Sequence, residues 1–127
     1  MLPGFLLPET TVREAGNGSE LDLGDSKGRL VLLTLGITRI IEQESLDVSI
    51  WGSVDGKEWG SKPLVVFPQK FYCGTSQILL DLGPHPDVRF LRVKWAAQRW
   101  GKGTSQPLFG FYVFAQDMKE QLLAASA

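Results

Sequence analysis

The chain has 127 residues, of which 43% are hydrophobic and 21% charged, and its 13 basic and 14 acidic residues leave a net charge of −1. This length suits one domain with a core of its own, and the composition excludes a disordered chain or a coiled coil. The small net charge excludes a bulk electrostatic attraction to nucleic acid or to an anionic membrane, so we expect any partner to be recognised locally.

The N-terminal residues are apolar but do not have the features of a secretion signal. They lack a basic segment, and Pro3 and Pro8 interrupt the hydrophobic run. The longest apolar run, residues 30–35, is far shorter than the ~20 residues that span a bilayer. Cys73 is the only cysteine, which excludes an intrachain disulfide. These features predict a cytoplasmic protein with no membrane-spanning segment.

The first part of the chain alternates between β-prone runs and turn signals. Residues 1–11 are predicted to form an extended arm with a short strand at Phe5 to Leu7, which the flanking prolines restrict to a sheet edge. Residues 14–28 indicate two turns on either side of a brief alternation at residues 20–23. Arg29 to Thr38 carries aliphatic side chains on both faces, which predicts a central strand buried on both sides.

The residues from Ser45 to Trp59, SLDVSIWGSVDGKEW, carry the clearest strand signal. Apolar and polar residues alternate here with the period of a strand that has one face on the core, and the core-facing set is Leu46, Val48 and Ile50. Asp55-Gly56 supplies the positive φ of a tight hairpin turn. Lys57 to Trp59 is therefore predicted to begin the returning strand.

The remaining β-prone runs are short and separated by turn formers: Pro63 to Phe67, Gln69 to Cys73, Gln77 to Leu82, Asp87 to Ala96 and Leu108 to Gln116. Within the fourth run the predicted core face consists of Arg89, Leu91, Val93 and Trp95. Residues 98–107 indicate a polar, glycine-rich loop. Residues 117–127 are predicted to form a tail or a short helix, because Asp117 and Glu120 have the spacing of a capping box.

Seven to nine short strands, with no helical pattern before the C-terminal tail, predict a single all-β domain over residues 1–127. We expect an antiparallel β-sandwich of jelly-roll type. Trp59 and Trp95 are assigned to its core.

Three segments, VSIWGSVDGKEW, VRFLRVKW and FGFYVFA, resemble the second half of discoidin-like or galactose-binding-like jelly rolls. The matching residues are Ser53, Asp55, Gly56 and Trp59, then Arg89 to Arg92, then Phe111 to Phe114. The resemblance implies the jelly-roll fold and a binding function such as carbohydrate binding. It assigns no ligand residue here, because the binding loops of that family lie largely outside the matching part. The Asp-Gly-x-x-Trp hairpin is also similar to that of β-sandwich structural proteins of phage particles.

Residue types that carry catalysis or bind metals are few. His85 lies between two prolines in a predicted turn, and Cys73 is predicted to pack as a small apolar residue. One histidine and one cysteine are too few for a usual zinc site. Asp22 and Asp25 lie in a glycine-bounded loop and are candidate calcium ligands, although solvated turn residues explain the same pattern. We therefore expect no enzymatic activity and no cofactor.

The candidate ligand-binding residues are Trp51, Arg99, Trp100 and Lys102. Trp51 falls on the face opposite to the core-facing set of its strand, where a large apolar ring indicates a contact. Trp100 lies between Arg99 and Lys102 in the polar loop, and a flat ring beside such donors suits a sugar or an anionic group. The alternative is that both tryptophans cover the ends of the sandwich.

Two functions follow as hypotheses. The first is a non-enzymatic module that binds carbohydrate or a protein partner, with no role for nucleic acid or membrane. The second is a structural subunit that self-associates as a homo-oligomer through a sheet face and the N-terminal arm.

Overall fold

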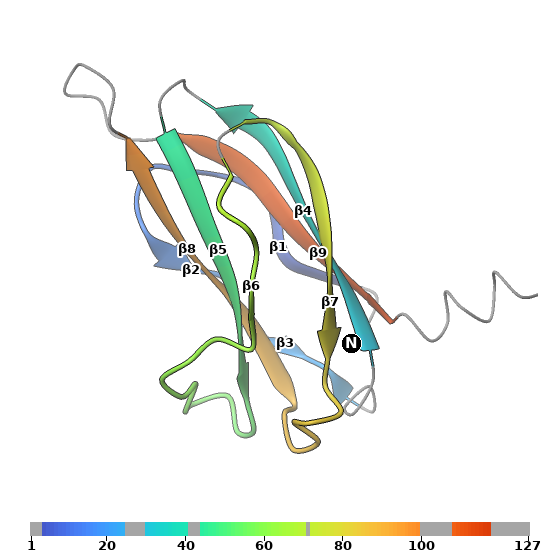
Figure 1. The fold of residues 1–127 in the computed structure, drawn as a ribbon. Coiled ribbons are helices and arrows are strands. Elements are labelled where there is room, and N and C mark those ends of the chain that lie inside the picture. The colour runs from blue at the N-terminus through green and yellow to red at the C-terminus, as the bar shows by residue number, and fades with distance from the viewer. Residues whose placement is uncertain (1–3, 25–29, 41–43, 71, 100–107, 118–127) are drawn as a thin grey trace, which may run out of the picture.

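The computed structural model describes residues 4–24, 30–40, 44–70, 72–99 and 108–117, and these residues form a sandwich of two antiparallel β-sheets (Figure 1). The strands are β1 Gly4–Val12, β2 Gly16–Asn17, β3 Leu21–Asp22, β4 Leu30–Ile40, β5 Glu44–Ser53, β6 Val65–Val66, β7 Gly74–Asp81, β8 Phe90–Arg99 and β9 Phe109–Asp117. The all-β class and the two-sheet architecture predicted from the sequence are thus confirmed.

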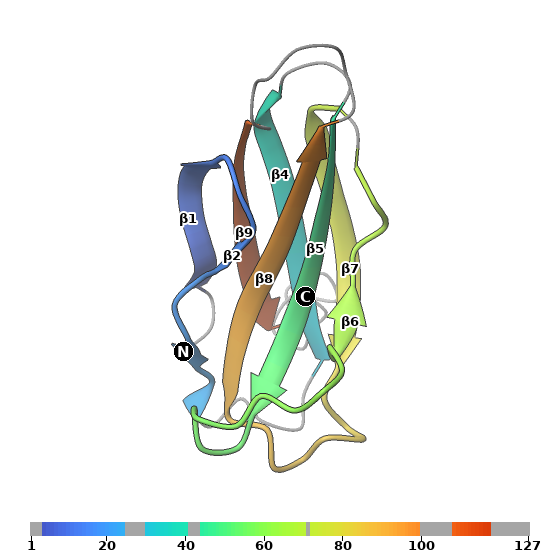
Figure 2. The same cartoon turned by 90° about the vertical axis from the view of Figure 1, so that its left-hand side faces the viewer.

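The first sheet has the strand order β1-β9-β4-β7, and the second has the order β2-β8-β5-β6, with β3 also paired with β8. Figure 2 shows the two sheets as facing layers, with β9 and β4 in one and β8 and β5 in the other. The chain passes from one sheet to the other at every connection except those from β2 to β3 and from β5 to β6. Residues distant in the sequence therefore become neighbours in each sheet.

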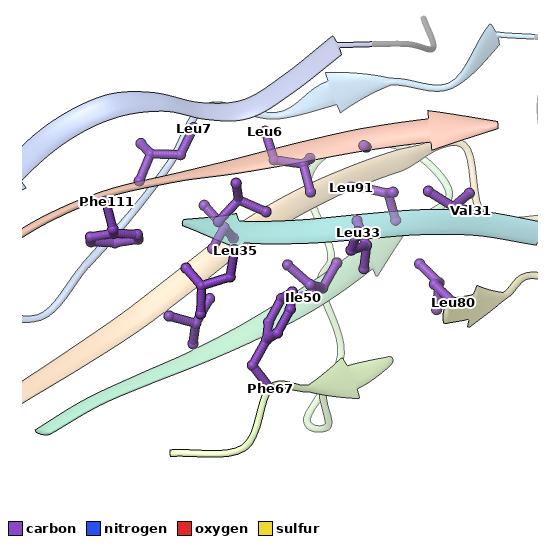
Figure 3. Close-up of a cluster of buried hydrophobic side chains, with 14 of the residues drawn as sticks. Leu6, Leu7, Val31, Leu33, Leu35, Ile50, Phe67, Leu80, Leu91 and Phe111 are labelled. Atoms are coloured by element: carbon purple, nitrogen blue, oxygen red, sulfur yellow. The ribbon is translucent and has the colours of Figure 1, made fainter. Parts of the chain in front are cut away.

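The core fills the space between the sheets because alternate side chains of each long strand point inward. Figure 3 shows side chains from both sheets meeting there, including Leu33 and Phe111 from the first and Ile50 and Leu91 from the second. The inward residues of β9 are Phe109, Phe111, Val113 and Ala115, all fully buried. The alternation predicted for β5 is confirmed, since its three core-facing residues are fully buried.

Other strand predictions are confirmed with changed boundaries. β1 is a sheet-edge strand as expected, but it extends to nine residues. The run predicted at 77–82 begins three residues earlier, in β7. In β8, Leu91 and Val93 are buried and Trp95 packs against the core, whereas Arg89 precedes the strand and is exposed.

The predicted tight hairpin after β5 is wrong. Gly56 does have a positive φ of 79°, but Lys57 to Trp59 form no strand, and β5 pairs next with the two residues of β6. The reason is that the amides of residues 55–58 are bound by the side chains of Ser53 and Asp55 instead of a neighbouring strand. The chain leaves the ladder at the turn and rejoins β5 at Leu64, whose amide donates to the Ile50 carbonyl at 2.8 Å.

The prediction that β4 is buried on both faces is also wrong. β4 is central as predicted, between β9 and β7, but only its odd-numbered side chains from Val31 to Ile37 enter the core. Leu30 is 39% exposed and Leu32 is half-buried. One face of the first sheet therefore carries apolar groups outside the core.

Three further assignments from the sequence need correction. The run 69–73 is no strand, because its described residues make one isolated bridge, between Lys70 and Leu46. Cys73 is exposed instead of packed. Trp59 is half-buried outside the core, where the guanidinium of Arg92 lies 4.4 Å from its ring centroid.

The predicted C-terminal helix after residue 117 lies outside the described residues, which contain no helix long and apolar enough to cross a membrane. The cytoplasmic location stays a prediction.

Candidate functional site

The outer face of the first sheet carries three aromatic side chains, Phe5 from β1 and Tyr112 and Phe114 from β9. On β9 the core takes the odd-numbered residues, so the even-numbered ones stand on the outer face. The pairing register then places Phe5 beside Phe114, Phe114 beside Thr34 of β4, and Thr34 beside Gln77 of β7. These four side chains form one row across the whole width of the sheet.

An open groove of about 680 Å³ lies along this row. It is lined by Phe5, Pro8, Glu9, Thr34, Gln77, Tyr112, Phe114 and Gln116. The lining is mainly apolar and includes amide and hydroxyl groups, one carboxylate and no basic side chain. We call this hollow the outer-sheet groove.

The three rings support each other edge to face. The Phe5 and Phe114 centroids are 4.8 Å apart at an interplanar angle of 62°, and those of Phe5 and Tyr112 are 6.1 Å apart at 80°. Such geometry is favourable because the positive edge of one ring meets the negative face of the other. Phe5 nevertheless stays 51% exposed, so aromatic surface is left open to a ligand.

Gly36 of β4 leaves the space in which the Tyr112 ring lies. The two residues are paired across β4 and β9, and a Cβ atom at residue 36 would overlap Cε1 and Cζ of Tyr112. The ring therefore occupies the space where any other residue would place its side chain. This explains a glycine in the middle of a central strand, where it otherwise weakens the sheet.

The polar groups at the groove are held by the sheet. Gln77 Nε2 donates to Thr34 Oγ1 at 3.3 Å, which leaves the amide oxygen of Gln77 outside this bond. At the β1 side, Thr38 Oγ1 donates to Glu9 Oε1 at 2.8 Å. The amide and carboxylate thus flank the rings from opposite edges of the sheet, where they can exchange hydrogen bonds with hydroxyl groups of a ligand.

Trp51, the one candidate ring from the sequence that the structure describes, lies on the other sheet. It is half-exposed on the outer face of β5, as predicted, but it does not line the outer-sheet groove. Lys94 Nζ lies 3.9 Å from its ring centroid, and its Nε1 donates to Ser49 Oγ at 2.9 Å. A cation of the same chain therefore already covers one face of this ring.

The other predicted ligand-binding groups, the Arg99 side chain, Trp100 and Lys102, lie outside the described residues. Whether they bind a ligand stays a prediction.

The candidate calcium ligand Asp22 is bound by an arginine. Arg89 Nε lies 3.1 Å from Asp22 Oδ1, its second nitrogen lies 3.3 Å from Oδ2, and the Gly24 amide donates to Oδ1 at 2.8 Å. The Arg89 hydrogen bond, followed by that of Gly24, lowers the pKa of Asp22. Asp25 lies outside the described residues, among which no group of three or more potential ligands could hold a metal ion.

Sequence reasoning missed the outer-sheet groove, although two signals pointed to it. In the last strand, FGFYVFAQ, the outward set contains Tyr112 and Phe114 beside the buried phenylalanines. Gly36 interrupts an aliphatic strand, and a glycine inside a strand often marks a place where another group approaches the backbone closely.

No protein-family model and no curated protein sequence matches this chain.

Proposed function

We propose that the domain is a non-enzymatic binding module of galactose-binding-like type, and that it binds a carbohydrate chain in the outer-sheet groove. The observation that carries the proposal is the row of Phe5, Phe114, Thr34 and Gln77 with Tyr112 beside it. A sugar ring presents C–H groups on its faces and hydroxyl groups around its rim. Exposed aromatic rings can stack against the C–H groups, and the flanking amide and hydroxyl groups can form hydrogen bonds with the sugar hydroxyls.

The strand order supports the jelly-roll part of this proposal. A double Greek key places its strands in two four-membered sheets whose connections cross between the layers. The orders β1-β9-β4-β7 and β2-β8-β5-β6, with their crossing connections, support that assignment. The short β3 is an extra piece on the edge of β8.

The shape of the groove favours an oligosaccharide over a single sugar. The groove reaches from β1 to β7, the two edges of a four-stranded sheet, which is a span of about 14 Å at the usual strand spacing. Its lining includes residues of both edge strands, so a longer chain could continue beyond the sheet on either side. The absence of a basic group among the lining residues favours a neutral glycan.

The test is a titration of the protein with neutral polysaccharides and their short oligosaccharides, followed by calorimetry. We expect Tyr112→Ala and Phe114→Ala each to weaken binding by roughly tenfold or more, because each removes part of the stacking surface. Trp51→Ala is the matched control, since Trp51 lies on the other sheet, and it should bind as the unmodified protein does. No binding by any neutral glycan, or equal losses in all three variants, would contradict the proposal.

A second candidate is a structural subunit of a larger assembly. It is favoured by apolar surface on the same sheet, since Phe5 and Leu79 are 51% and 50% exposed. The N-terminal arm adds little to it, because Leu6 and Leu7 are buried within their own chain. Light scattering that shows large assemblies, together with no glycan binding, would favour this function.

A further inference from the structure

The edges of the two sheets differ in how they prevent pairing with another chain. In the second sheet both edges are short, because β2, β3 and β6 have two residues each. In the first sheet, β1 contains Pro8, and its register against β9 shifts twice between Phe5 and Thr10. Short strands, prolines and bulges are the usual devices that block edge-to-edge association.

β7, the other edge of the first sheet, has none of these devices. All its residues from Gly74 to Asp81 pair with β4 in one unbroken register. Its sequence, GTSQILLD, has no proline and no basic residue, and its single charge is Asp81 at the end. Figure 2 shows β7 along the margin of its sheet, beyond β4.

Among the described residues, one side of the β7 backbone has no partner strand. In an antiparallel ladder about half of the N–H and C=O groups of an edge strand point away from its neighbour. Within the described part of the chain, β7 pairs with β4 alone, and no other backbone hydrogen bond reaches it. These groups form a template for one more strand.

We propose that β7 pairs antiparallel with β7 of a second copy of this chain, which joins the two first sheets into one continuous sheet with two-fold symmetry. A strand paired with its own copy in this way is self-complementary, and the dimer is closed. The antiparallel arrangement places the two Asp81 carboxylates at opposite ends of the shared ladder, so they do not repel each other. Leu79, 50% exposed and paired with Leu32, contributes apolar surface on the outer face beside the junction.

The dimer places the two outer-sheet grooves on the same side. A two-fold axis perpendicular to the joined sheet keeps both outer faces together, and Gln77, which lines the groove, lies on the pairing strand itself. Two sites in line bind one long chain with a higher effective affinity than a single site. This consequence rests on the proposed carbohydrate function, whereas the pairing of β7 does not.

The test is the molecular mass in solution by light scattering over a range of protein concentrations. We expect the unmodified protein to form a dimer whose fraction rises with concentration. Thr75→Lys combined with Leu79→Lys should give a monomer, because each change places a charge at the shared edge. Thr11→Lys on β1, the opposite edge of the same sheet, is the matched control and should remain dimeric. A monomer at all concentrations, or a dimer that only the control disrupts, would overturn the proposal.

A second test uses the unmodified protein, so its result does not depend on whether a variant folds. Hydrogen exchange of the β7 amides should slow as the concentration rises, while that of β1 amides stays the same. Equal exchange in β7 at low and high concentration would also overturn the proposal. The monomeric variant should still bind a short oligosaccharide, so failure of the dimer and failure of the carbohydrate function are distinguishable.

Discussion

At the scale of single residues, Ser53 and Asp55 determine how the chain leaves β5. Ser53 Oγ accepts from the Gly56 amide at 2.9 Å, and Asp55 Oδ1 accepts from the amides of Lys57 and Glu58 at 2.8 and 3.0 Å. The Glu58 amide, then the Lys57 amide and the Ser53 hydroxyl, lower the pKa of Asp55 because they bind its charged form. The turn is therefore most stable when Asp55 is ionised.

This link between charge and turn gives a pH dependence. Since the pKa of Asp55 is lower in the folded than in the unfolded chain, its contribution to stability is complete above the unfolded value of about 3.9 and is lost as the pH falls through the folded value. Asp55→Asn should lower the free energy of unfolding near neutral pH and flatten its decline below about pH 4. Urea unfolding at several pH values measures both effects.

The control for Asp55 is Asp87→Asn, an exposed position in the loop before β8. A residual acid dependence should persist in the Asp55 variant, because Arg89 also lowers the pKa of Asp22. Identical pH profiles for the unmodified protein and Asp55→Asn would contradict the interpretation.

Gly36 offers a second prediction at this scale. In Gly36→Ala the new methyl group takes the space of the Tyr112 ring, which is half-buried and can turn outward at a cost of about 0.5–1.5 kcal/mol. We expect the variant to fold with slightly lower stability. The Tyr112 ring should no longer lie in its place at the outer-sheet groove. Urea unfolding measures the cost, and calorimetry with a glycan that the unmodified protein binds measures any loss of binding.

A double-mutant cycle provides the control. In a Tyr112→Ala background the alanine at 36 has nothing to displace, so its cost in stability should disappear. The same cost in both backgrounds would show that the ring does not occupy this space.

At the scale of elements, β6 depends on the residue that follows it. Phe67 is only 1% exposed, and its amide donates to the Val48 carbonyl at 2.9 Å, so the ring reaches the core from outside any strand. In Figure 3 it lies beneath Ile50 of β5. Without this ring the two residues of β6 would have little to hold them against β5.

Phe67→Ala should therefore lower the free energy of unfolding by about 3–5 kcal/mol, the usual cost of removing a buried ring. The neighbouring Val66→Ala is the matched control, because Val66 is 52% exposed, and its effect should stay within about 0.5 kcal/mol. Urea unfolding of both variants tests the difference, and a similar small effect in both would contradict it.

The strands that sequence reasoning predicted best are those with one face on the core. β5, β8 and β9 alternate cleanly, because burial imposes a period of two that is visible in the residues themselves. The prediction of a returning strand after β5 was wrong. An Asp-Gly pair predicts a turn, but it does not show that nearby side chains bind the amides that a returning strand would need. The core assignment of Trp59 was wrong for a related reason, since Trp59 does not lie in a strand whose alternation could be read.

The outer-sheet groove could not be predicted from the sequence for a different reason. Phe5 and Phe114 come from near the two ends of the chain, and only the pairing of β1 with β9 makes them neighbours. Strand register is set by the whole sheet and cannot be read from a single segment. The individual outward rings were visible in the sequence, but their assembly into one site was not.

At the scale of the whole molecule, the two outer faces have different chemistry. On the second sheet, Lys94 lies over Trp51 and Arg92 over Trp59, so each of these rings already has a cation of its own chain. On the first sheet the outer rings contact one another edge to face, no cation of the described residues lies over them, and one of them is more than half exposed. This contrast is why the first sheet is the better candidate for binding.

The adjacency of β1 and β9 also determines how the domain responds to mechanical load. Gly4 lies opposite Ala115, so the first residue of β1 and the last paired residue of β9 lie at the same end of the strand pair. Tension applied at that end of β1 and β9 would strain the hydrogen bonds of this strand pair one after another, so the pair would peel apart under a smaller force than shearing would need. Phe5 would be pulled away from Tyr112 and Phe114 at the first step, so tension would take the outer-sheet groove apart before the rest of the sandwich yields.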